Sequence, residues 1–354
     1  MKKSIWWIVG IVVVVLIVIS VTNKKPGENV IKVGAVYALT GPAAVFGEIS
    51  AKGVRDAVTY FKQKEGIDVQ LFLEDSANDP KQGVSAAQKM FDINKVRFAV
   101  VGTSGITNAI SPLADQYKAL LITDAAGYGL TKDKTFLFQN FLPSLNDVAK
   151  QLNSNEKWKR VALVYINDEF GNIWYKKTSD ALVSKQSLGT SFAKDAKDFK
   201  TEALKIKQFN PDVMFVLGYG PALNQVYADL ALQGVKSEII SYLSCTLPGV
   251  LSDKRYSLEG NFSYEYPLPL SQDIVSWIKA NNGESNTFYD LAFENTLIAL
   301  IAAKESGNDP IVAKEYLKDN SIRALYGDVI FNSANVSERD LKISLIKDNK
   351  CQSL

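Results

Sequence analysis

The residues of this 354-residue chain that could do chemistry lie in short hydroxyl- and glycine-bearing segments after strand-like runs. The segment GTSGITNA (102–109) leads into a helical pattern, so its hydroxyls and backbone N–H groups lie at a helix start, which favours anions. The segment TDAAGYG (123–129) follows a second strand-like run and also exposes backbone groups. Together they predict an anion-gripping site, although Thr103 or Ser104 could instead only cap the helix.

Several classes of catalytic site are excluded by what the chain lacks. Histidine is absent, which removes Ser-His-Asp and Cys-His catalysis and most zinc sites. Asp75, Asp79 and Asp124 are not paired by a catalytic spacing. The first strand-to-helix loop, ALTGPAAVFGE (38–48), lacks the G-x-G-x-x-G fingerprint, and no Walker loop occurs. We therefore expect that the chain is not an enzyme and uses no cofactor or metal.

The two cysteines, Cys245 and Cys351, show no metal-ligand spacing. A disulfide between them cannot be read from the sequence. Because Cys351 lies in a polar C-terminal tail of the kind that frays, we expect the two residues to stay unjoined.

The bulk composition is that of a folded chain with sizeable cores. Apolar residues make up 47% and charged residues 22% of the chain, and its length suits two domains. The formal net charge of +2 gives no support for a nucleic-acid partner.

The first 25 residues read as a membrane-directed segment. Residues 5–21 carry no charge and follow two lysines, in a run longer than the ~7–15 residues of a cleaved signal and close to the ~20 of a spanning helix. We expect an uncleaved N-terminal anchor, with a cleaved signal peptide as the alternative. The preceding lysines place the N-terminus in the cytoplasm and the rest of the chain on the exported, periplasmic or extracellular, face.

Strand and helix patterns alternate twice along the rest of the chain. A first block of strand–helix units runs from residue 30 to about 126, and a second from about 160 to 244. Such repeated alternation is typical of a parallel sheet covered by helices on both faces. The expected fold class is therefore α/β, with two doubly wound, Rossmann-like lobes.

Several motifs in order make the chain resemble a known family. The runs VGAVYALTGPAAVFGE, LEDSANDPKQGVSAAQKM, VVGTSG, SPLADQYKALLITDAA and YGDVIFN are similar to those of type I periplasmic solute-binding proteins, in particular the Leu/Ile/Val-binding branch that serves ABC importers. The resemblance covers about residues 30–347.

The resemblance implies the domain organisation. It implies two lobes joined by three hinge crossings that close on a ligand. The first lobe would comprise 30–140 and 268–325, and the second 141–267 and 326–354.

The resemblance also implies a grip for a ligand carboxylate. Ser104 corresponds to the gripping serine, with Thr103 beside it, and the strand end Ala125–Gly127 supplies further contacts. Where the family often has Ser or Thr, this chain has Gly127, so one hydroxyl contact is lost and only the backbone N–H remains.

The resemblance also implies that aromatic residues form the walls of the ligand cleft. Phe46, Phe170 and Tyr219 match aromatic positions in the cleft, although Phe46 and Phe170 could equally pack into the core. Tyr219 follows a strand end, where cleft residues belong. Asp168 and Glu169 are expected to be solvated loop charges.

The chain differs from the family where a residue would pair with the ammonium group of the ligand. The segment SYLSCTLPG (241–249), where the family usually offers an acid, has none, and an unpaired buried ammonium is costly. Either Asp124, Asp290 or Glu265 substitutes, or the ligand lacks an ammonium group. The ligand is thus an amino acid, another carboxylate or a small amide, and Asp290 joins the expected binding residues.

Two functions of different kinds remain open. The leading expectation is an exported binding protein that delivers a small solute to ABC transporter membrane subunits. The alternative is a ligand-sensing extracellular domain that works through a partner receptor.

Overall fold

The computed structural model describes residues 30–143, 145–282 and 286–353. The expected N-terminal anchor lies outside these residues. Within them, no helix combines the length and the apolar character that crossing a bilayer requires.

The first sheet has six parallel strands in the order β13-β5-β4-β3-β1-β2. Its strands are β1 (Ile31–Tyr37), β2 (Val69–Asp75), β3 (Phe98–Val101), β4 (Leu120–Thr123), β5 (Leu137–Pro143) and β13 (Val336–Arg339). The inner strands are short apolar runs that are buried on both faces, as parallel sheets require.

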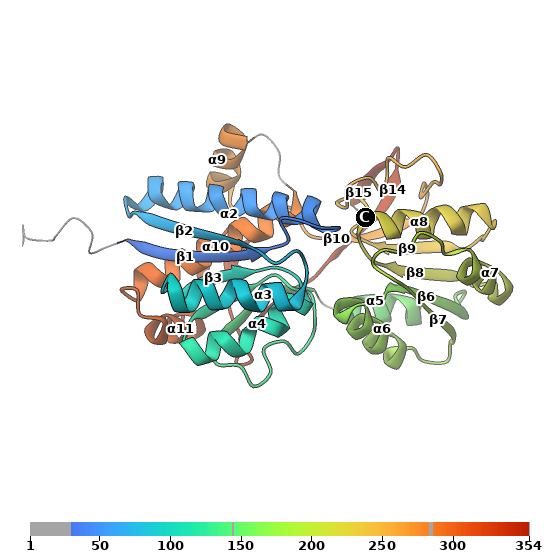
Figure 1. The fold of residues 1–354 in the computed structure, drawn as a ribbon. Coiled ribbons are helices and arrows are strands. Elements are labelled where there is room, and N and C mark those ends of the chain that lie inside the picture. Colours follow the sequence, from blue (N-terminus) through green and yellow to red (C-terminus); the bar gives the residue numbers. More distant parts are fainter. Residues whose placement is uncertain (1–29, 144, 283–285, 354) are drawn as a thin grey trace, which may run out of the picture.

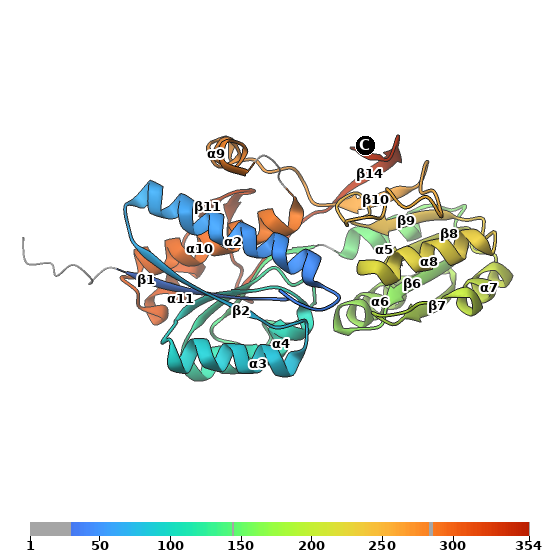
Figure 2. The ribbon, with the colours of Figure 1, turned by 45° about the horizontal axis from the view of Figure 1, so that its top comes forward.

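Helices cover both faces of this sheet, as Figure 2 shows for α2 on one side and α3 and α4 on the other. The helices of this lobe are α2 (Ala44–Glu65), α3 (Pro80–Gln88) continuing as the π-helix η1 (Lys89–Ile93), α4 (Ser104–Tyr117), α9 (Gln272–Asn282), α10 (Thr287–Glu305) and α11 (Pro310–Asp319). A short antiparallel pair, β11 (Ile322–Ala324) and β12 (Gly327–Val329), follows α11.

Helices α2 and α10 pack closely because α2 carries a glycine at their crossing. A Cβ atom at Gly53 would lie 2.3 Å from the backbone oxygen of Tyr289 on α10. The late helix α10 thereby returns to the first lobe, although it is distant from α2 in the sequence.

The second sheet has seven strands in the order β15-β14-β10-β9-β8-β6-β7. Its strands are β6 (Arg160–Ile166), β7 (Gln186–Phe192), β8 (Val213–Leu217), β9 (Glu238–Tyr242), β10 (Phe262–Glu265), β14 (Lys342–Lys347) and β15 (Lys350–Ser353), of which the last two are antiparallel to their neighbours. The helices α5 (Leu145–Ser154), α6 (Glu169–Ala181), α7 (Lys200–Phe209) and α8 (Gly220–Leu232) cover its faces, and the two lobes lie side by side (Figure 1).

The strand order requires the described chain to pass between the sheets three times: after β5, after β10 and after β13. The third passage differs from the sequence-based boundary at 325/326. Strand β13 pairs in parallel with β5 of the first sheet, so the chain reaches the second sheet only at β14.

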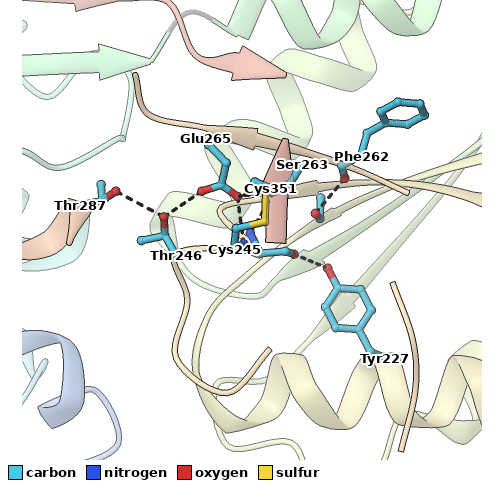
Figure 3. Close-up of a disulfide and its surroundings, with 10 residues drawn as sticks. Tyr227, Cys245, Thr246, Phe262, Ser263, Glu265, Thr287 and Cys351 are labelled. Atoms are coloured by element: carbon cyan, nitrogen blue, oxygen red, sulfur yellow. Dashed lines mark hydrogen bonds between the residues drawn. A yellow bond between two sulfur atoms is a disulfide. The ribbon is translucent and has the colours of Figure 1, made fainter. Parts of the chain in front are cut away.

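The expectation that the two cysteines stay unjoined is wrong, because Cys245 and Cys351 form a disulfide (Figure 3). The C-terminal tail is not frayed. Asp348 and Asn349 both adopt positive φ angles, of 53° and 55°, which suits a two-residue hairpin turn, and β15 pairs with β14 beyond it. The hairpin extends the second sheet and brings Cys351 to Cys245.

Candidate functional site

A cavity of about 180 Å³ lies between the two lobes. For comparison, an apolar cavity of about 150 Å³ admits a molecule the size of benzene. The cavity therefore suits one small solute.

The cavity lies where strands of both sheets end. In the first lobe, Tyr37 ends β1, Gly102 follows β3 and Asp124 follows β4; in the second, Asp168 follows β6 and Tyr242 ends β9. The carboxyl ends of parallel strands are where doubly wound folds bind ligands. Both lobes thus present their expected binding edge to one cavity.

The start of α4 forms one wall of the cavity and leaves polar groups without partners there. Thr103 precedes the helix and makes no capping hydrogen bond; its hydroxyl donates instead to Asn78, with 3.3 Å between the oxygens. Ser104 is only 3% exposed, and its hydroxyl has no hydrogen-bond partner among the described residues. Neither side chain caps the helix, so Ser104 and the helix N–H groups remain for a ligand.

The strand end beside α4 is held rigidly. The side-chain amide of Gln139 donates to the backbone oxygens of Ala125 and Gly127. A Cβ atom at Gly127 would lie 2.8 Å from the Ser104 hydroxyl, so only glycine leaves the serine its place.

Carboxyl groups from both lobes line the cavity. Burial raises the pKa of Asp124 to about 7. Burial, and next the charge of Asp168, raise the pKa of Glu169. Neither Asp124 nor Glu169 is paired with a lysine or arginine in the part of the chain that the structure describes. Lys194, which is exposed, brings a basic group to the lining.

Asp168 has a more specific role than the solvated loop charge expected from the sequence. It accepts from the backbone N–H of Gly171 at 2.9 Å, which caps α6, and from the hydroxyl of Tyr219 at 2.5 Å. It therefore orients one aromatic wall of the cavity, and its neighbour Glu169 also faces the lining.

The aromatic walls join the two lobes. The ring of Phe46, on α2, lies 6.1 Å from that of Tyr219 in the second lobe and 4.9 Å from that of Phe288. Phe170 packs against Tyr242 with ring centroids 5.8 Å apart. These rings, of which Tyr242 is buried and the others are half-buried, surround the cavity with apolar surface.

A direct hydrogen bond also links the lobes. The indole N–H of Trp174, on α6, donates to the backbone oxygen of Ala126 at 2.9 Å. Together with the Phe46–Tyr219 contact, it closes the two lobes around the cavity.

Asp75 and Asp79, two of the acids considered as a catalytic set, instead stabilise the backbone of nearby segments. Asp75 accepts from the N–H of Leu39 at 2.8 Å and from the hydroxyl of Thr40 at 2.6 Å, which anchors the first strand-to-helix loop. Burial raises the pKa of Asp75, but these hydrogen bonds outweigh it and the net shift is downward. Asp79 caps α3.

Most of the expected binding residues border the cavity. Those in its lining are Phe46, Thr103, Ser104, Ala125, Phe170 and Tyr219. Gly127 lies behind Ser104 and is not part of the lining. Asp290 is buried in the first lobe, where it accepts from the hydroxyl of Tyr326 at 3.3 Å, and it does not line the cavity.

Sequence reasoning missed several aromatic residues of the lining. They are Tyr37, Tyr242, Tyr266 and Phe288. The first two end strands and Tyr266 directly follows one, so a search for aromatic residues at the carboxyl ends of strands could have found three of the four. Phe288 is the second residue of α10 and carries no such signal.

The sequence of this chain matches a known protein family and a characterised relative. It matches the family described as "Periplasmic binding protein" over residues 30–344. It is 26% identical to the Leu/Ile/Val-binding protein of Escherichia coli (strain K12), over 89% of this chain and 90% of that protein.

Two solved structures share the fold. A branched-chain amino acid transporter substrate binding protein from Streptococcus pneumoniae, in complex with isoleucine, has a TM-score of 0.81 at 17% identity and covers 92% of this chain and 99% of its own. A solute binding protein of an ABC transporter from Rhodopseudomonas palustris BisB5, in complex with 3,4-dihydroxybenzoic acid, has a TM-score of 0.76 at 17% identity, with coverages of 92% and 96%.

Proposed function

Because this chain belongs to the periplasmic binding protein family, we propose that it captures a small solute between its lobes and delivers it to an ABC importer. The relatives are binding proteins, and this chain is likewise not an enzyme. The three passages between the sheets would act as the hinge on which the lobes open and close.

The solute is an amino acid. One observation carries this proposal: the same small cavity holds an unpartnered hydroxyl at a helix N-terminus, that of Ser104, and an uncompensated carboxyl group, that of Asp124. The first suits a carboxylate and the second an ammonium group. A zwitterion satisfies both, and Asp124 thereby takes the place of the acid that the 241–249 segment lacks.

The apolar lining suits the side chain of such a solute. Phe46, Phe288 and Tyr219 supply aromatic faces, and Leu243 and Leu247 supply aliphatic surface. Branched or aromatic side chains fit this surface best, because they release most water on burial.

A carboxylate without an ammonium group is the second candidate. The aromatic lining favours it, as does the similarity in fold to a protein solved with 3,4-dihydroxybenzoic acid. Against it stand the carboxyl groups of Asp124 and Glu169, which would repel an anion, whereas the exposed Lys194 is the one basic side chain in the described lining.

Isothermal titration against matched solutes separates the two candidates. The panel contains L-isoleucine, L-leucine and L-phenylalanine, the acids that lack their amino group, and 4-hydroxybenzoate. We expect the amino acids to bind at least about tenfold more tightly than their deaminated partners, because only they pair with Asp124. Tighter binding of the deaminated acids would overturn the amino-acid proposal, and no heat from any member would overturn the solute site itself.

The uncharged run at residues 5–21 would hold the protein to the membrane on the exported face. This arrangement would keep the binding lobes beside the importer.

A further inference from the structure

The wall that the second lobe gives to the cavity includes a tight turn after β9. In this turn, residues 243–247, the backbone oxygen of Leu243 accepts from the N–H groups of Thr246 at 3.0 Å and Leu247 at 2.8 Å. Leu243 has a φ of 57°, which bulky side chains rarely adopt, so other contacts must hold the turn. Both leucines line the cavity.

The buried carboxylate of Glu265 stabilises this 243–247 turn by hydrogen bonds. Glu265 accepts from the backbone N–H of Cys245 at 3.0 Å, from the hydroxyl of Thr246 at 2.8 Å and from that of Ser263 at 2.6 Å. Figure 3 shows these groups converging on Glu265 beside the disulfide. Because Glu265 ends β10, the turn is fixed to the point where the chain leaves the second lobe.

The disulfide adds the only covalent constraint on the turn in the described chain. It joins Cys245 to Cys351, which lies 106 residues further along the sequence on the edge strand β15. Among the described strands β15 pairs only with β14, so this bond ties the outer strand of the C-terminal hairpin to the turn.

The turn also reaches the other lobe. The hydroxyl oxygens of Thr246 and Thr287 lie 3.4 Å apart, and Thr287 is the first residue of α10. Thr287 and its neighbour Phe288 line the cavity. Thr246 thus connects Glu265 to the opposite wall, as Figure 3 shows.

We propose that the Cys245–Cys351 disulfide is a positioning element of the solute site. By tying the 243–247 turn to the C-terminal hairpin, it holds Leu243 and Leu247 in the wall and Thr246 against Thr287. The closed arrangement is then preorganised, so the oxidised protein binds its solute more tightly than the reduced protein. This inference rests on the proposed function.

Reduction provides the direct perturbation. A dithiol attacks the disulfide, the sulfur–sulfur bond breaks, and two cysteine thiols form while the dithiol is oxidised to its own cyclic disulfide. Two electrons and two protons pass from the reagent to the protein, so the step balances.

The test compares the oxidised protein, the dithiol-reduced protein and the double variant C245S/C351S. Each is titrated with the amino acids and acids of the panel, and amide hydrogen exchange is followed in the 243–247 turn and at Phe288. We expect reduction and the double substitution each to weaken binding about tenfold and to speed exchange in the turn. Far-UV circular dichroism and the melting temperature identify a variant that has failed to fold.

A second substitution separates positioning from general stability. Thr246→Val removes the hydroxyl that links Thr287 to Glu265 and leaves the disulfide intact, and Thr190→Val, on the remote strand β7, is its matched control. We expect Thr246→Val to weaken binding in the oxidised protein and to add a smaller loss in the reduced protein, because both changes release the contact with Thr287. Thr190→Val should leave binding unchanged in both.

The outcomes distinguish this inference from the proposed function. Equal affinity and equal exchange in oxidised and reduced protein overturn the positioning role and leave the solute site intact. If no panel member binds the oxidised protein, the proposed function fails, and the exchange data decide the positioning role alone. Faster exchange in the reduced turn and at Phe288 then supports it, and unchanged exchange overturns it.

Discussion

Raising the pH from about 5.5 to about 8.5 should tighten the binding of an amino acid about 30-fold, because Asp124 must be ionised to pair with the ammonium group. In the free protein, burial raises the pKa of this carboxyl to about 7. The ammonium would lower it in the complex, so binding at low pH must first expel a proton. Affinity therefore rises as the pH passes through the free-state pKa, and it levels off above it.

The magnitude follows from the fraction of Asp124 that is ionised before binding. With a pKa of about 7, this fraction is about 3% at pH 5.5 and about 97% at pH 8.5. The ratio is about 30, which corresponds to about 2 kcal/mol of binding free energy. For a carboxylate solute without an ammonium group, the affinity should instead fall as the pH rises, because ionised Asp124 would repel it.

Isothermal titration with L-isoleucine across this pH range measures the effect. The variant Asp124→Asn should remove most of the pH dependence and bind weakly throughout. Glu169→Gln is the matched control, since Glu169 also lines the cavity with a raised pKa and could contribute a smaller part. Affinity that is flat, or that falls as the pH rises, would refute the assignment of Asp124 as the ammonium partner.

Three further predictions concern the anion grip, the disulfide and the N-terminal segment. Ser104→Ala should weaken binding by about 1–3 kcal/mol in titration. Ser111→Ala, on the same helix but outside the lining, should leave binding unchanged. Equal losses in the two variants would make Ser104 a structural residue. Removing the Cys245–Cys351 bond, which spans 106 residues, should lower the free energy of unfolding by about 4–5 kcal/mol in denaturant titrations, and a loss below about 1 kcal/mol would contradict the chain-entropy reasoning. Deleting residues 5–21 should move the protein from the membrane fraction to the soluble fraction, and an unchanged distribution would refute the anchor.

The alternation of strands and helices predicted the two α/β lobes, because buried parallel strands and their covering helices leave strong periodic patterns. Local capping leaves an equally readable signal, because Asp79 followed by Pro80 marks the start of α3. The place of β13 was not readable. This strand has four residues, and nothing in so short a run says which of two sheets it joins.

The disulfide and the roles of Asp168 and Glu169 were missed for two other reasons. The Asp348–Asn349 pair between two short runs was a usable hairpin signal, and it would have removed the argument that Cys351 frays. Asp168 and Glu169 look like ordinary loop charges in the sequence, because only the approach of the opposite lobe encloses them. Long-range closure of this kind leaves no local pattern.

The most direct test is a crystal structure of the protein with the panel member that binds most tightly. We predict that the solute lies in the cavity between the lobes, with its carboxylate at the Ser104 hydroxyl and the α4 N-terminus and its ammonium group at Asp124. A solute bound outside the cavity, or one inside it with its carboxylate turned away from Ser104, would contradict the account.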